Sequence, residues 1–180
     1  MTATQAISLY LISEKAAGHS SFWWPYIETL PQCYTNAACW TDEDISKLPQ
    51  RLRLSFTKQR QLLDKSYQDV VPFVSDNKDS LPSLFRFFSF DSYRWAWSAI
   101  NTRTVYMKQE KCDFLNDEEE DHFALIPFLD LLNHTTEAEV DLGIIYVNYV
   151  MNYKIEHFIS PYKYVHIERY DNLFPIQIIF

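Results

Sequence analysis

Apolar residues in the N-terminal part of the chain recur at the three- and four-residue spacing of amphipathic helices. We predict one helix over 3–17, ended by Gly18, and a longer one over 52–71. A third helix begins at Asp91, a good N-cap, and runs toward Val105. The apolar positions of the three predicted helices are Ala6, Ile7, Leu9, Leu11 and Ile12; Leu52, Phe56, Leu62, Leu63, Tyr67, Val70 and Val71; and Trp95, Trp97 and Ile100.

Two shorter helices are predicted from local stop and start signals. Residues 20–34 are aromatic and interrupted by proline, and Pro25 fits the first turn of a short helix that Pro31 would end. Thr41 and Asp44 form a Thr-x-x-Asp pattern, which is an acidic variant of the capping box. A further short helix should therefore start there.

The amino-acid composition changes in the C-terminal part of the chain. Residues 141–180 are rich in Ile, Val, Tyr and Phe with polar interruptions, a composition that favours strands. Helices are thus predicted up to about residue 110, and strands after it. Such a segregated order is typical of the α+β class.

Composition and charge narrow the function classes. The chain has 180 residues, of which 47% are apolar and 17% aromatic, so one folded domain is expected. A net charge of −8 argues against direct binding to nucleic-acid phosphates, and it would attract a basic peptide. The apolar stretch 142–150 is shorter than the roughly 20 residues that span a bilayer, and no secretory signal is evident. We expect no membrane partner and a nuclear or cytoplasmic protein.

Glycine and cysteine usage excludes further classes. The only glycines are Gly18 and Gly143, so neither a GxGxxG fingerprint nor a P-loop is present. The cysteines are Cys33, Cys39 and Cys112, an odd number without CxxC spacing. This pattern argues against a disulfide framework and against a zinc site, and it fits a reducing compartment.

The most informative stretch is 124–134, which reads Ala-Leu-Ile-Pro-Phe-Leu-Asp-Leu-Leu-Asn-His. Its apolar part needs burial, and Asp130, Asn133 and His134 then need partners, because a buried polar group left unpaired costs roughly 1–3 kcal/mol. The fold itself or a polar ligand can supply those partners. Asp130 can also cap a neighbouring helix or pair with Arg103.

Three segments in order resemble the SET-domain protein methyltransferases of the Rubisco-large-subunit-methyltransferase type. They are 20–31, which contains Phe-Trp-Trp-Pro-Tyr; 93–103, which begins Tyr-Arg-Trp-Ala-Trp; and 124–134. In that family a helical insert splits the SET fold. The resemblance therefore implies an α+β fold with a helical SET-insert region over 1–110 and a partial, β-rich C-terminal half of the SET domain over 111–180.

The same resemblance implies S-adenosylmethionine as cofactor and a protein-lysine N-methyltransferase as the activity. Asn133 would hold the methionine end, the backbone around His134 would meet the adenine, and Arg103 and Asp130 would line or brace the pocket. A zwitterionic tail needs donors and acceptors, and an Asn side chain offers both. The partner would be a protein or peptide that carries a lysine, such as a histone.

The chain departs from the family pattern in two places. The family has a Gly-x-Gly cofactor loop before the aromatic segment, and only Gly18 precedes that segment here. When Asp171 and Asn172 are aligned with the family's final pair, Ile167 takes the place of the catalytic tyrosine and Glu168 that of the glycine after it.

These departures affect the expected activity, because positioning supplies most of the rate of methyl transfer. We therefore assign no catalytic residue and expect little or no transfer by this chain, as in a truncated enzyme or a pseudo-enzyme. A non-catalytic peptide-binding module is the alternative. An unrelated helical scaffold with a coincidental Asn-His pair is a third reading.

Overall fold

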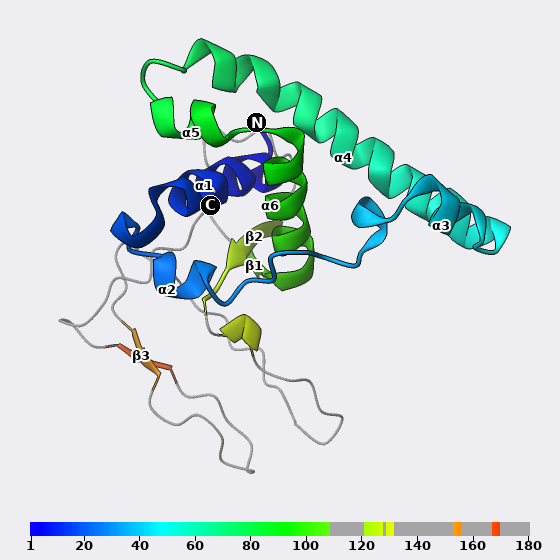
Figure 1. The fold of residues 1–180 in the computed structure, drawn as a ribbon. Helices are drawn as coiled ribbons and strands as arrows, with labels where there is room; N and C mark the ends of the chain where they lie inside the picture. The colour runs from blue at the N-terminus through cyan, green and yellow to red at the C-terminus, as the bar shows by residue number, and fades with distance from the viewer. Residues whose placement is uncertain (109–120, 128, 132–152, 156–166, 170–180) are drawn as a thin grey trace.

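The computed structural model describes residues 1–108, 121–127, 129–131, 153–155 and 167–169. The helices are α1 (Ala3–Ala17), α2 (Trp24–Ile27), α3 (Asp42–Ser46), α4 (Gln50–Asp76), α5 (Pro82–Phe87) and α6 (Phe90–Arg103), with 3₁₀ turns η1 (Gly18–Ser20), η2 (Ala37–Cys39) and η3 (Leu129–Leu131). The strands are β1 (Thr104–Lys108), β2 (Asp121–Leu125), β3 (Tyr153–Ile155) and β4 (Ile167–Arg169) (Figure 1).

Helix α1 lies at the centre of the helical part, where it contacts α6 and α5 (Figure 1). Its buried residues occupy more than one face, as in a helix enclosed by neighbours. Thr2 and Gln5 form a capping box at its start, and Gly18 ends it with a φ of 55°, a conformation that glycine adopts without strain. The prediction of a helix over 3–17 is confirmed. Its buried apolar residues are Ala3, Ile7, Leu9, Leu11 and Ile12.

Helix α4 is longer than the predicted 52–71 and carries a narrower buried stripe. Its buried residues are Leu63, Val70 and Val74, whereas Leu52 and Leu62 are 46% and 62% exposed. Leu52 and Leu62, which belong to the predicted apolar positions of this helix, therefore lie outside its buried stripe. The N-terminal half of α4 extends past α6 (Figure 1), and among the described elements the short α3 and the 3₁₀ turn η2 also contact α4.

Helix α6 begins at Phe90, and its N-cap is Ser89, which shares a capping box with Ser92. The predicted cap, Asp91, lies instead in the first turn and pairs with Arg94 at 2.8 Å. That prediction is wrong by two residues, although a carboxylate in the first turn still complements the helix dipole. The helix ends at Arg103 and continues directly into β1.

The two shorter helices follow their local signals. Pro25 lies in the first turn of α2, which ends before Pro31. Thr41 and Asp44 form the predicted capping box at the start of α3. Both short helices are confirmed, although α2 already ends at Ile27, before Pro31 is reached.

The strands pair antiparallel, β1 with β2 and β3 with β4. Together with the helices they are compatible with the α+β class. Most of the strands predicted over 141–180 fall outside the described residues. None of the helices that the structure describes is long and apolar enough to cross a bilayer.

Candidate functional site

Asp130 joins two segments that are far apart in the sequence. Its Oδ2 accepts a hydrogen bond of 2.8 Å from the Tyr26 hydroxyl and one of 2.7 Å from Arg103 Nη1. The Asp130 side chain is 3% exposed and that of Arg103 is 18% exposed. This is a buried, charge-assisted cluster, and such bonds are shorter and stronger than neutral ones.

The β1–β2 hairpin explains how Asp130 reaches Arg103. Arg103 is the last residue of α6, and Thr104, the first residue of β1, pairs with Leu125 at the end of β2. The chain therefore returns to the end of α6 just before η3, which carries Asp130. Tyr26 arrives separately from α2 and is 4% exposed.

The charges of the cluster are mutually stabilising. Burial raises the pKa of the Tyr26 hydroxyl, and its bond to Asp130 raises this pKa further, so Tyr26 stays a neutral donor. Burial alone would lower the pKa of Arg103, but the bond to Asp130 and its charge raise it overall. Arg103 is therefore a permanent cation at this position.

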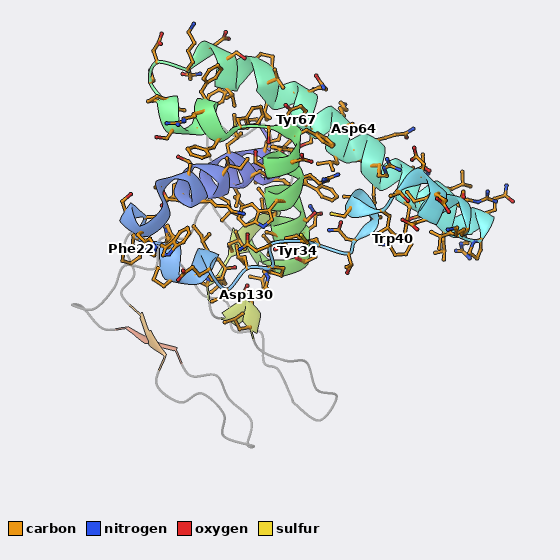
Figure 2. The ribbon with its side chains drawn as sticks, viewed as in Figure 1. Phe22, Tyr34, Trp40, Asp64, Tyr67 and Asp130 are labelled. Carbon is orange, nitrogen blue, oxygen red and sulfur yellow. The ribbon has the colours of Figure 1, made fainter. Side chains whose placement is uncertain are left out.

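Two buried polar atoms of the site lack hydrogen-bond partners within the part of the chain that the structure describes. They are Asp130 Oδ1 and the Tyr34 hydroxyl oxygen. Burial raises the pKa of Tyr34, the charge of Arg103 and a polar contact with its guanidinium lower this pKa, and the charge of Asp130 raises it, so Tyr34 lies near both charged groups. Figure 2 shows Tyr34 and Asp130 close together at the end of α6. Leaving such atoms unpaired costs about 1–3 kcal/mol each, and a ligand can remove that cost.

The donors and acceptors present fit the α-amino-acid end of S-adenosylmethionine. A guanidinium has five N–H donors, so the bond between Arg103 and Asp130 leaves others for a carboxylate. The unpartnered Asp130 Oδ1 is an acceptor for an ammonium. Among the described residues, no group of three His, Cys, Asp or Glu side chains is placed to hold a metal ion.

The structure brings together two of the four residues that the sequence singled out. Arg103 and Asp130 form the ion pair that was one of the expected alternatives. Asn133 and His134 lie outside the described residues. Sequence reasoning missed Tyr26 as a member of the cluster, although it follows the proline of the Phe-Trp-Trp-Pro-Tyr segment.

The position aligned with the catalytic tyrosine lies in β4. Ile167 there pairs with Ile155 of β3, and Arg169 pairs with Tyr153. Tyr164 and Tyr170, the nearest tyrosines along the chain, lie outside the described residues. Among the described residues, the polar feature of the site is the Asp130–Arg103 ion pair, with Asp130 Oδ1 left unpartnered.

The known proteins that resemble this chain in sequence are methyltransferases or SET-domain proteins by name. No protein-family model matches the chain. It is 38% identical over 140 residues to SET domain-containing protein 4 of Homo sapiens, a match that covers 75% of this chain and 31% of the relative. The corresponding protein of Artemia parthenogenetica is 31% identical over 156 residues, covering 87% of this chain and 37% of the relative.

A second group of relatives is named for a different target. Actin-histidine N-methyltransferase of Xenopus tropicalis is 32% identical over 132 residues, which covers 72% of this chain and 21% of the relative. The chain thus spans between a fifth and two fifths of the length of these curated relatives. Their names, together with the agreement across most of the chain, lead to one conclusion: this chain is a relative of the SET-domain methyltransferases.

Proposed function

We propose that this chain binds S-adenosylmethionine as part of a protein methyltransferase, with the Tyr26–Asp130–Arg103 cluster at the amino-acid end of the cofactor. The observation that carries the proposal is the buried Asp130 carboxylate, in which Oδ2 accepts two hydrogen bonds and Oδ1 has no partner among the residues that the structure describes. The methyltransferase relatives support the choice of cofactor.

Each residue has a separate role in this proposal. Arg103 binds the carboxylate of the cofactor, and Asp130 Oδ1 accepts from its ammonium. Asn133 adds a donor and an acceptor at the same end, and the backbone around His134 meets the adenine; both roles come from the family resemblance. When bound, S-adenosylmethionine supplies the methyl group that a substrate nitrogen accepts.

The proposed substrate is a protein side-chain nitrogen. A lysine, for example in a histone, is the first candidate, and the acidic chain, with a net charge of −8, would attract such a basic peptide. The relatives named actin-histidine N-methyltransferase make a histidine the second candidate. Both residues present a nitrogen nucleophile.

We assign 1–110 to the helical insert and 111–180 to the C-terminal part of the SET core. Helices α1 to α6 all fall within the first region, and β1 follows α6 without a break. Because the sequence has neither the Gly-x-Gly loop nor the tyrosine at Ile167, we propose that this chain by itself transfers little or no methyl group.

The alternative is a non-catalytic module that binds peptides. These 180 residues do not include the family's glycine loop, so any cofactor pocket within them would lack that close backbone approach. The two proposals differ in one measurable property, the affinity for S-adenosylmethionine.

Calorimetric titration of the purified chain with S-adenosylmethionine tests the proposal. We expect micromolar binding that Asn133→Ala abolishes. Asn101→Ala is the matched control, because Asn101 is exposed and bonds only to the carbonyl of Trp97 among the described residues. Absence of binding by folded protein would refute cofactor binding and leave the interaction module.

The same protein can be assayed for methyl transfer. Labelled S-adenosylmethionine with lysine-bearing and histidine-bearing peptides should give no turnover above background. Turnover on either peptide would contradict the proposed inactivity and would identify the nucleophile.

A further inference from the structure

Two tyrosines lie near the Asp130–Arg103 pair, and their hydroxyls differ in hydrogen bonding. The Tyr26 hydroxyl donates to Asp130 Oδ2 at 2.8 Å. The Tyr34 hydroxyl is also buried, but it has no hydrogen-bond partner among the residues that the structure describes. Tyr34 belongs to the segment between α2 and η2, so the helical region supplies both hydroxyls.

The chemistry of the two unpartnered atoms defines what they can bind. Asp130 Oδ1 is a carboxylate oxygen and only accepts hydrogen bonds, so its partner must be a donor. A phenol oxygen both donates and accepts. A primary ammonium carries three donors and a positive charge that the Asp130 carboxylate attracts, so it can satisfy both atoms at once.

The nearby guanidinium restricts the choice further. Arg103 is 2.7 Å from Asp130 Oδ2, and its charge also acts on Tyr34. A lone ammonium would be repelled by this cation. A zwitterion avoids the repulsion, because its carboxylate lies on the Arg103 side and its ammonium on the side of Asp130 Oδ1.

We propose that Tyr34 is a specificity-determining residue of the site, and that its hydroxyl and Asp130 Oδ1 together accept the ammonium of an α-amino-acid group. This inference rests on the proposed function, and it extends the site to the segment between α2 and η2. Tyr34 was not among the site residues predicted from the sequence, which are Arg103, Asp130, Asn133 and His134.

The test is Tyr34→Phe, examined with two probes. S-adenosylmethionine carries the amino-acid end, and 5′-methylthioadenosine lacks it. We expect the variant to bind S-adenosylmethionine about tenfold more weakly, as for the loss of one hydrogen bond to a charged group. Binding of 5′-methylthioadenosine should not change.

A second measurement separates this role from a structural one. Because the Tyr34 hydroxyl makes no hydrogen bond to any residue that the structure describes, Tyr34→Phe should leave the thermal midpoint of the ligand-free protein unchanged or raise it. The matched control is Tyr93→Phe. Tyr93 is fully buried and its hydroxyl bonds to that of Ser66 at 2.7 Å, so this variant should lower the midpoint and leave both affinities unchanged.

Each remaining outcome overturns the inference. Equal affinity of wild type and Tyr34→Phe for S-adenosylmethionine would remove Tyr34 from the site and leave the proposed function standing. Equal weakening of both probes, or a lower midpoint for Tyr34→Phe, would give Tyr34 a structural role. A wild-type chain that binds neither probe would overturn the inference and the proposed function together.

Discussion

The buried pair of Arg103 and Asp130 permits a double-mutant cycle in the free energy of unfolding. Arg103→Met leaves the Asp130 carboxylate, 3% exposed, without its counter-ion. Removing one partner of a buried ion pair typically costs about 3–5 kcal/mol. We expect Arg103→Met to lose free energy of unfolding within that range.

The opposite single variant leaves a charge that is less deeply buried. In Asp130→Leu the Arg103 side chain, 18% exposed, can reach water, which places the loss for this charge at the lower end of the same range, about 3 kcal/mol. The variant also removes the acceptor of the Tyr26 hydroxyl, a hydrogen bond to a charged group worth about 1.5–3 kcal/mol. Both single variants should therefore be strongly destabilised.

The double variant should lose far less free energy of unfolding than the two single variants lose when their losses are added. Replacing both charges of a buried ion pair with apolar side chains of similar size is often neutral or even stabilising relative to the intact pair. Urea denaturation of all four proteins gives the coupling energy, and each 1 kcal/mol corresponds to a thermal shift of about 2–4 °C for a chain of this size. Additive effects, or single variants that lose under about 1 kcal/mol, would show that this pair does not hold η3 against α6.

Three further predictions rest on the helices and on Tyr26. Leu63→Ala should cost about 2–5 kcal/mol and its exposed neighbour Leu62→Ala less than about 0.5, measured by urea denaturation; equal costs would contradict the observed stripe. Ser89→Ala should cost about 1 kcal/mol and Asp91→Ala less, because Ser89 is the N-cap; the reverse order in thermal unfolding would return the cap to Asp91. The raised pKa of Tyr26 favours the protonated folded form, so its contribution is fully present below about pH 10 and is lost as the pH rises further. The urea midpoint should fall steeply above that pH and less steeply in Tyr26→Phe, and identical slopes would contradict this reasoning.

The helix ends that were predicted correctly depend on side chains a few residues away. Gly18 ends α1, Pro25 opens α2, and the Thr41–Asp44 pair caps α3. Each signal acts on the backbone of its own turn, so no distant segment is needed to interpret it. These boundaries could be read from the chain alone.

The errors concern choices between locally equivalent options. Ser89 and Asp91 are both residue types that cap helices well. The helix that starts at Phe90 packs the Phe90 ring against Tyr67 of α4, with 5.3 Å between the ring centroids. Leu62 and Leu63 are equally apolar, but only Leu63 meets the core. In both cases the neighbouring helix decides.

The site shows the same division. The sequence predicted Arg103 and Asp130 by residue type and by resemblance, and it left open whether they would pair. It gave no reason to add Tyr26, which is 104 positions from Asp130, or Tyr34. Only the folded chain shows that these side chains lie near the carboxylate.

The sequence by itself thus determined that α1, α2, α3, α4 and α6 form, where α1 ends, how α3 is capped and the relation to SET-domain methyltransferases, because periodicity, capping and motifs are local properties of the chain. The tertiary structure alone decided which apolar face is buried and which hydroxyls meet Asp130. Burial and hydrogen bonding depend on segments that the chain brings together only on folding, and the hairpin of β1 and β2 that returns η3 to the end of α6 is the step that assembles the site.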